Sequence, residues 1–334
     1  MTAARRDARL DEAFVHCEGI TRARARNFYY GLKLTPPAQR GAMYAVYAWM
    51  RQADDLADAA GLEDHERRRR IAMLRERTRR LFDEAGSGGG SGVGAGVDSE
   101  RGLADPSSSA DPVWIAMADT VRRFRLSIDP FESMLDGQLE DVEHREYRTF
   151  EDLRGFCYRV ASTVGLVCIT IWGYRDPRAR ELAIDRGIAF QLTNILRDVH
   201  EDFARGRVYL PAEDFERHGL TPEQLMAWGH GSVGGERCRR FILEQAERVE
   251  QYYRRSAELD AMIDPGCRPT LWAMSTIYHG LLGKIVAHPS AVVGSRRIRL
   301  SCVTKGLIAW RARRQAAAAM QDPMVAEAWR AGTS

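Results

Sequence analysis

The chain has 334 residues, 45% of them hydrophobic and 28% charged, so it is long and apolar enough to bury a large core. Its 49 basic and 46 acidic residues are interspersed and leave a net charge of only +3, which gives no case for nucleic-acid binding. The six cysteines include no Cys-x-x-Cys pair, which favours reduced, mostly buried thiols in a cytosolic protein over a zinc site.

The N-terminal segment, residues 1–20, is polar, and its first ten residues lack the apolar run of a secretory signal, so we expect no export. One domain is expected to follow over residues 21–315, with a tail at 316–334. After the helix-breaking pair Pro36-Pro37, apolar residues recur every three to four positions, which predicts a helix. These residues are Ala42, Ala45, Val46 and Trp49.

The first of two acidic motifs lies near the end of that predicted helix. Asp54 and Asp58 are four positions apart, which places both on one helix face. Arg51 precedes them by one turn. An isolated pair of this kind is usually solvated, so its meaning depends on what else the chain contains.

The segment from Gly86 to Ala110 consists mostly of Gly, Ser, Ala and Asp, which bury too little apolar surface to offset the entropy of ordering. Because the helical pattern resumes at Pro112, we interpret it as a flexible surface loop within one domain. Its deletion should leave activity and melting temperature nearly unchanged.

The most apolar stretch, Val160 to Trp172, is shorter than the ~20 residues of a membrane-spanning helix and contains Ser162, Thr163 and Gly165. It is therefore predicted to be a core helix. No stretch of the chain alternates regularly enough to predict a strand, which indicates an all-α protein.

A second acidic motif lies on a later predicted helix, where Asp198 and Asp202 again share a face. Four carboxylates from two helices could converge on one cavity, and they repel one another unless cations separate them. Oxygen ligands suit Mg2+, with Mn2+ as an alternative, and Mg2+ is usually shared with substrate phosphates. Both motifs lie near helix C-termini, whose carbonyls add negative potential. The sequence therefore predicts a phosphorylated ligand.

Arginines gather near the C-terminus, which makes this part locally basic. A solvated helix face is one interpretation, and contact with a membrane surface is the other. The residues are Arg296, Arg297, Arg299, Arg311, Arg313 and Arg314.

The ordered set of motifs resembles the squalene and phytoene synthase family over most of the chain, from about Asn27 to Arg314. The matching segments are Phe28-Tyr29-Tyr30; Ala45 to Asp58; Tyr147-Arg148-Thr149-Phe150-Glu151-Asp152-Leu153; Cys157 to Leu166; and Gln191 to Asp202 followed by Gly206-Arg207-Val208-Tyr209-Leu210-Pro211.

This resemblance implies a single-domain, all-α isoprenoid synthase bundle with a central cavity. Members join two allylic prenyl diphosphates head to head through a cyclopropylcarbinyl diphosphate. We favour phytoene formation from two geranylgeranyl diphosphates, with squalene, dehydrosqualene or presqualene diphosphate formation from farnesyl diphosphate as the alternative. A non-catalytic helical scaffold is the rival of another class, and the retained aspartates oppose it. NADPH is needed only for the reductive route to squalene.

The resemblance also implies roles for individual residues. Metal ions would be held by Asp54, Asp58, Asp198 and Asp202. The diphosphate and its metal shell would be contacted by Tyr47, Arg51, Gln191, Asn194, Arg197, Tyr278 and Arg297, with Arg299 as a substitute for Arg297. Walls of the cavity would include Phe28, Tyr29, Leu135, Val160, Val164, Leu166 and Leu192.

Two positions differ from many relatives, which carry Ser at Asn27 and Met at Gln138. We expect neither Asn27 nor Gln138 to contact the aspartates. Asp136 and Asp141 are expected near the site, mainly through metal-bound water, whereas His200 should point away from it. We expect a cytoplasmic location, which could be peripheral to the inner membrane face for product delivery, and leave the oligomeric state open.

Overall fold

The computed structural model describes residues 3–25, 29, 31–57, 61–86, 111–143, 146–228 and 235–319. Within these ranges the protein is helical, and its only extended pairing is an isolated bridge between Tyr174 and Ile263. The all-α prediction is confirmed. The helices are α1 (Ala3–Arg24), α3 (Pro37–Ala57), α4 (Asp64–Gly86), α5 (Pro112–Phe124), α6 (Asp129–Val142), α7 (Phe150–Cys157), η1 (Tyr158–Ser162), α8 (Thr163–Trp172), α9 (Ala179–Ala204), α10 (Ala212–His218), α11 (Pro222–Ala227), α12 (Gly235–Arg255), α13 (Leu259–Met262), α14 (Arg268–Ala287), η3 (Pro289–Val293) and α15 (Cys302–Ala319).

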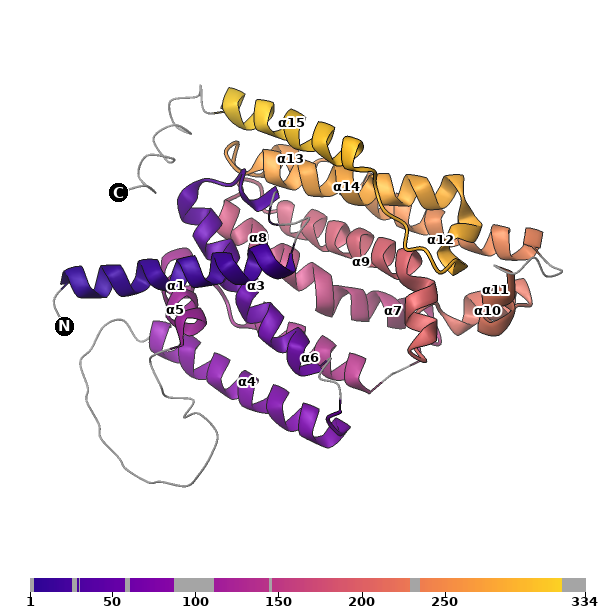
Figure 1. The fold of residues 1–334 in the computed structure, drawn as a ribbon, viewed down its shortest axis with the longest axis horizontal. Coiled ribbons are helices and arrows are strands. Elements are labelled where there is room, and N and C mark those ends of the chain that lie inside the picture. Colours follow the sequence, from indigo (N-terminus) through magenta and orange to yellow (C-terminus); the bar gives the residue numbers. More distant parts are fainter. Residues whose placement is uncertain are drawn as a thin grey trace.

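Helix α9 runs through the middle of the bundle, with α15 and α4 on opposite edges (Figure 1). It contacts α8, η1, α12 and α14. The buried apolar residues form two clusters, one built mainly from α1, α3 to α6 and α8, the other mainly from α9, α10, α12 and α14. The space where these two clusters meet is available for a site.

The outer helices cross the domain boundaries expected from the sequence. Residue 20 lies inside α1, whose Ala13 and Cys17 are buried in the first cluster, and residue 315 lies inside α15. Small buried residues among many arginines give a weak periodic signal, which is why the sequence did not reveal this packing. The predicted loop lies outside the described residues after Gly86, the last residue of α4.

One long helix combines α7, η1 and α8 from Phe150 to Trp172. It begins with a capping box in which Thr149 and Asp152 each accept a backbone N–H. By length and composition alone these 23 residues could span a membrane. The expectation that the apolar stretch is too short for this was wrong, because it considered residues 160–172 without the helical turns that precede them. More than half of its most apolar window is buried, and Ile169 and Trp172 lie in the first cluster, as expected for a core helix.

The middle of this helix is a π-helical turn, η1, which packs tightly on α9. A Cβ at Gly187 of α9 would lie 2.5 Å from the Cα of Ser162 and 2.7 Å from its backbone nitrogen. The Ser162 hydroxyl donates to the carbonyl of Ile184 at 2.8 Å. π-Helical turns are frequent at functional sites, and this one is fixed directly against the helix that carries the second acidic motif.

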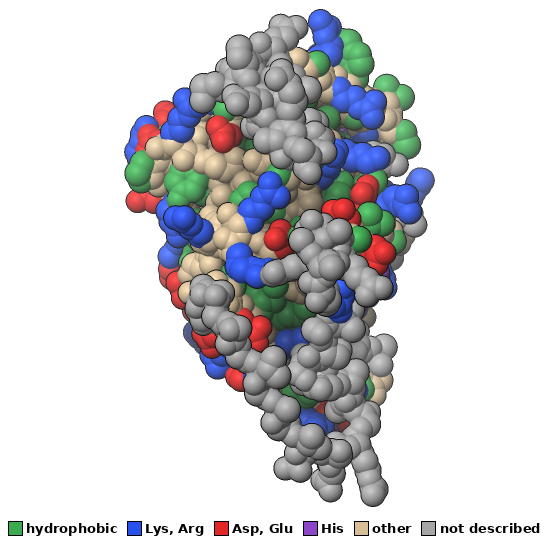
Figure 2. Space-filling view, turned by 90° about the vertical axis from the view of Figure 1, so that its left-hand side faces the viewer, with side chains coloured by type: hydrophobic (Ala, Val, Ile, Leu, Met, Phe, Trp, Pro, Cys, Tyr) green, Lys and Arg blue, Asp and Glu red, His purple; other side chains and the backbone are tan. Residues whose placement is uncertain are grey.

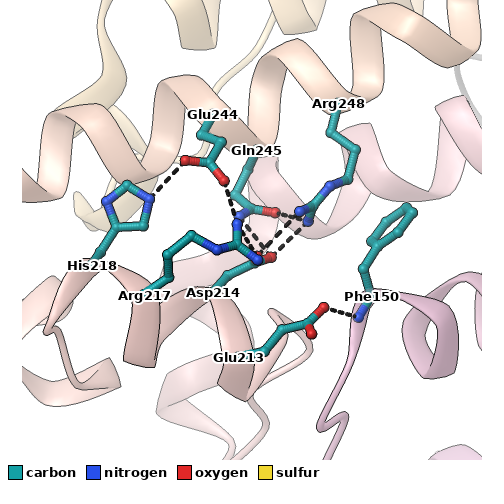
Figure 3. Close-up of polar contacts among 8 residues, drawn as sticks. All are labelled: Phe150, Glu213, Asp214, Arg217, His218, Glu244, Gln245 and Arg248. Carbon is teal, nitrogen blue, oxygen red and sulfur yellow. Dashed lines mark hydrogen bonds and ion pairs between the residues drawn. The ribbon is translucent and has the colours of Figure 1, made fainter.

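The chain beyond the second motif is anchored by a buried carboxylate. Asp214 of α10 is fully buried and accepts from Arg248 at 2.6 and 3.1 Å and from Gln245 at 2.9 Å (Figure 3). The neighbouring Glu213 accepts the backbone N–H of Phe150 at 2.7 Å, at the start of α7. Together these contacts tie α10 to α12 and α7, which fixes the segment 207–211 that lies between α9 and α10.

The described surface carries mixed charge, and acidic and basic side chains are interspersed over the face in Figure 2. All six cysteines are free; five are buried and Cys302 is exposed. This confirms the expectation of mostly buried thiols.

Candidate functional site

Two neighbouring cavities lie along α9. The first, of about 440 Å³, takes carboxylates from three helices, and we call it the acidic cavity; they belong to Asp54, Asp141, Asp198 and Asp202. The second, of about 610 Å³, is lined by five cationic side chains from four parts of the chain, and we call it the cationic cavity; they belong to Arg24, Arg197, Arg297, Arg299 and Lys305. Asn194 and Arg197 line both cavities.

Both acidic motifs contribute carboxylates to the acidic cavity, each from a different helix. Asp54 comes from α3, which ends at Ala57, and Asp198 and Asp202 come from α9, which ends at Ala204. Both motifs therefore lie near helix C-termini, as predicted. The wall takes Met134 from the first hydrophobic cluster and Ile195 from the second, so the cavity lies where the clusters meet. Asp58 and Phe28 lie outside the described residues.

Asp198 is held by two arginines. Arg197 donates to its two oxygens at 2.8 and 2.5 Å, and Arg297 donates to the same oxygens at 2.9 and 2.6 Å. Burial opposes ionisation of this carboxyl, but the hydrogen bonds from the two guanidiniums outweigh it and lower its pKa. Asp198 is therefore ionised, and two guanidiniums compensate its negative charge.

Asp202, one turn further along α9, is in the opposite situation. Its carboxylate has no hydrogen bond or ion pair with the described residues, although it lines the same cavity. Burial raises the pKa of Asp202 to about 7, and the negative charge of Asp198 adds to the shift. The positive charges of Arg207 and Arg205 oppose this rise in pKa only in part, so a bound cation would add to the compensation of the carboxylate.

Asp54 accepts a hydrogen bond from the side-chain amide of Gln138 at 2.7 Å. The expectation that Gln138 does not contact the aspartates was therefore wrong. The helical period of α6 explains the contact, because Met134, Gln138 and Asp141 share one face and line the acidic cavity together.

Asp141 is the fourth carboxylate of the cavity. It accepts from the Tyr209 hydroxyl at 2.5 Å and pairs with Arg207 at 3.0 Å. Asp136, by contrast, pairs with Arg75 of α4 at 2.5 Å on the outer side of α6. Of the two acidic residues expected near the site, only Asp141 lies in it.

The cationic cavity receives several of the predicted substrate-binding residues. Tyr47 from α3, Tyr278 from α14 and Arg297 all line it, while Gln191 lines the acidic cavity. The side-chain oxygen of Asn194 is buried without a hydrogen-bond partner in the described part of the chain. This leaves one unsatisfied acceptor in a residue that lines both cavities.

Other predicted residues lie away from both cavities. Arg51 pairs with Asp55, and with Asp54 at 3.7 Å, on α3. The Tyr29 hydroxyl donates to Glu18 of α1 at 2.8 Å, and its ring is buried beside Tyr44. Of the described wall candidates Val160 lines the acidic cavity, whereas the others belong to the core or pack against it; these are Leu135, Val164, Leu166 and Leu192. His200 hydrogen-bonds the carbonyl of Val293 at 3.1 Å and lines neither cavity.

The donor set of the acidic cavity fits Mg2+ in a particular way. No three His, Cys, Asp or Glu side chains of the described ranges lie close enough to form a ready metal cage. Mg2+ seldom uses such a cage, because it keeps several waters and binds one or two carboxylates together with phosphate oxygens. Carboxylates from three helices in one cavity, beside a cavity lined by cations, match a metal that is shared with a diphosphate.

Some residues of the site have no clear sequence signal. Arg24 and Lys305 line the cationic cavity from α1 and α15, far apart in the chain, and only the fold brings them together. Arg207 and Tyr209 could have been found, because they stand in the conspicuous segment directly after the second motif.

Comparisons with known proteins found similar sequences and folds over most of the chain. A family model described as squalene/phytoene synthase matches residues 21–304. A phytoene synthase of Arthrospira platensis is 33% identical over 305 residues, covering 87% of this chain and 90% of the relative, and one of Mycobacterium tuberculosis is 34% identical over 300 residues, covering 90% of each.

Two solved structures have similar folds. A dehydrosqualene synthase in complex with a ligand has a TM-score of 0.72 at 28% identity, covering 91% of this chain and 96% of the other. A squalene synthase from Alicyclobacillus acidocaldarius has a TM-score of 0.69 at 25% identity, covering 83% and 94%.

Proposed function

This chain belongs to the squalene/phytoene synthase family, a family of prenyltransferase-type enzymes, and we propose that it joins two geranylgeranyl diphosphates head to head to form phytoene. The observation that carries the product assignment is the identity of 33–34% to phytoene synthases over about nine-tenths of their length. The paired acidic and cationic cavities support the reaction class, because a prenyl diphosphate needs both a metal site and cationic donors.

The two cavities divide the proposed roles between residues that hold metal and residues that bind the diphosphate. Bound Mg2+ supplies charge neutralisation for the departing diphosphate. In this proposal Asp54 and Asp58 hold metal from α3 and the chain that follows it, and Asp198 and Asp202 hold it from α9. Arg197 lines both cavities, so it contacts the diphosphate from either one. Its planar guanidinium matches two phosphate oxygens at once.

Hydroxyl and cationic groups complete the diphosphate site in this proposal. Tyr47 and Tyr278 donate from opposite helices, and Asn194 uses its unpaired oxygen toward a cation or water. Arg297 moves between Asp198 and the diphosphate. Gln191 orders the wall of the acidic cavity. Arg51, which lies outside both cavities, supports Asp54 through its ion pair and does not contact the substrate itself.

Apolar side chains on the acidic cavity keep water from the reacting carbons. Met50, Phe156 and Val160 line it beside the carboxylates. Aromatic faces stabilise a nearby positive charge by roughly 0.5 to 2 kcal/mol each. A cavity with this lining suits an allylic cation that must meet a second prenyl chain before it meets water.

The alternative is a farnesyl diphosphate substrate with squalene, dehydrosqualene or presqualene diphosphate as product. The observation that favours it is the likeness to solved dehydrosqualene and squalene synthases. Incubation of the purified protein with Mg2+ and either farnesyl or geranylgeranyl diphosphate, with and without NADPH, distinguishes these products by mass spectrometry. Phytoene from geranylgeranyl diphosphate without NADPH is expected, and a product from farnesyl diphosphate alone would refute the chain length.

Product delivery to a membrane is part of the proposal, because a forty-carbon hydrocarbon is insoluble in water. Helix α15 exposes Val303, Leu307 and Trp310 at helical spacing, and it contains basic residues but no acidic ones. A face of this composition binds the surface of an anionic bilayer. We propose that this face brings the protein, expected in the cytoplasm, to the inner membrane face. Sedimentation with anionic vesicles tests this: Trp310→Ser should bind more weakly, and equal binding would contradict it.

A further inference from the structure

The segment that joins η3 to α15, residues 294–301, forms part of the wall of the cationic cavity, and we call it the strap. It runs without helix or strand between the two elements (Figure 1). Four of its residues line the cavity, and they are Arg297, Ile298, Arg299 and Leu300. The course of the strap therefore decides where these side chains stand in the cavity.

Arg297 joins the strap to the second acidic motif. Its guanidinium donates to the two oxygens of Asp198 at 2.9 and 2.6 Å and lies 3.3 Å from a carboxylate oxygen of Glu201. Two parallel contacts of this kind are demanding in geometry, because both N–H groups must align at once. The backbone that carries Arg297 must accordingly be held to within about 0.5 Å.

Beyond Arg297 the strap is anchored by packing. Ile298 and Leu300 are buried in the second cluster. The ammonium group of Lys284 donates to the carbonyl of Arg299 at 2.8 Å. These contacts fix the half of the strap that leads into α15.

Before Arg297 the anchoring is different, because Ser295 and Arg296 are exposed. This half starts at Val293, the last residue of η3, whose carbonyl lies 3.1 Å from the Nδ1 atom of His200 on α9. A carbonyl can only accept, so the ring nitrogen donates here. The hydrogen bond orients the peptide unit that links Val293 to the strap, and so sets the direction in which the strap leaves η3.

Packing of η3 itself does not depend on this hydrogen bond. Val292 and Val293 are both buried in the second cluster, and η3 contacts α9, α12 and α14. His200 is only partly buried and lines neither cavity. The main consequence of its contact is therefore expected in the strap and not in the core.

We propose that His200 is a positioning residue for Arg297. By holding the carbonyl of Val293, it places the start of the strap so that the guanidinium of Arg297 reaches both Asp198 and a diphosphate in the cationic cavity. This inference rests on the proposed function in assuming that a diphosphate binds there. It gives a role to a histidine that stands inside the second motif without touching the substrate.

The test is a double-mutant cycle of His200→Ala and Arg297→Gln. The Kd for inorganic diphosphate is measured by isothermal titration calorimetry in the presence of Mg2+. A neutral hydrogen bond is typically worth about two- to tenfold in an equilibrium constant. We expect His200→Ala to raise the Kd about fivefold in the wild-type background, but by less than about twofold when residue 297 is already glutamine, because both changes remove the same interaction.

His200→Asn is the rescue variant, since its side-chain amide can donate to the same carbonyl. Its Kd should stay within about twofold of wild type. The matched control is His279→Ala on α14, which removes a histidine contact to Glu250 at 2.7 Å outside both cavities. It should leave the Kd unchanged, and metal-free His200→Ala should melt within about 2 °C of wild type.

An unchanged Kd in His200→Ala overturns the inference. So does an equal rise in the Kd with and without the guanidinium of Arg297, or a His200→Asn protein that binds no better than His200→Ala. Because the titration needs no turnover, a protein that binds diphosphate but makes no phytoene contradicts only the proposed product. A wild-type protein that binds no diphosphate overturns the inference as well.

Discussion

Replacement of Gly187 by alanine should destabilise the protein, although alanine is the better helix former. The new Cβ would lie 2.5 and 2.7 Å from two backbone atoms of Ser162, about 1 Å closer than an ordinary carbon contact. Backbone atoms cannot rotate away, so α9 and η1 must separate. The hydrogen bond from Ser162 to the carbonyl of Ile184 would lengthen with them.

The expected magnitude is a difference between two effects. Overpacking costs about 1–3 kcal/mol, and more where the clash involves backbone. Alanine in place of glycine inside a helix returns up to ~1 kcal/mol. We therefore expect a net loss of about 1–3 kcal/mol in the free energy of unfolding, or roughly 2–6 °C in melting temperature. Since η1 and α9 both line the acidic cavity, kcat/KM should also fall by at least about tenfold.

Urea denaturation followed by circular dichroism measures the first effect, and phytoene formation measures the second. The matched control is Gly283→Ala in α14, where a Cβ meets nothing within 4 Å. That variant should be more stable than wild type by up to ~1 kcal/mol and fully active. A Gly187→Ala protein at least as stable as wild type would show that the helices are not packed as tightly as described.

Three further predictions concern charged residues. In the folded protein the pKa of Asp202 is raised from 3.8 to about 7, so this carboxyl lowers the stability of the metal-free protein as pH rises from about 4 to 7. Asp202→Asn should therefore be more stable than wild type at pH 8 in EDTA, by ~1–2 kcal/mol after solvent screening, and nearly equal in stability at pH 4. An equal difference in stability at both pH values contradicts this. Burial opposes ionisation of Asp214, but hydrogen bonds from Arg248 and Gln245 lower its pKa, so its contribution to stability is present above pH 4 and lost on acidification. Asp214→Ala should lower the free energy of unfolding by about 3 kcal/mol at pH 7 and by less at pH 3, as measured by urea midpoints. The same loss at both pH values would refute an ionic role. Asp54→Asn and Asp198→Asn should each abolish turnover while retaining the helical spectrum, and residual activity near wild type would exclude them as metal ligands.

Much of the fold and part of the site could be predicted from the sequence because helical periodicity and the paired aspartates are local signals. The positions of Asp54, Asp198 and Asp202 in one cavity follow from spacing and from the need to share a cation. Local signals also placed both motifs near helix ends, since prolines and glycines mark those ends directly.

The remaining features depend on tertiary contacts. Nothing local indicates that Tyr29 turns toward Glu18, or that Arg51 lies outside both cavities beside Asp55. The amide of Gln138 reaches Asp54 only because α6 and α3 are packed in a particular rotation. Wall residues were the least predictable, because an apolar side chain at helical spacing serves equally well in a core and in a cavity.

The arginine pair on Asp198 means that the second acidic motif carries its own counter-ions. A cation that binds there must exchange with a guanidinium, whereas Asp202 next to it has none to release. In the proposed function such an exchange would free Arg297, which already lines the cationic cavity, to bind an anion there. By thermodynamic reciprocity the bound anion would then favour binding of the metal to the same extent.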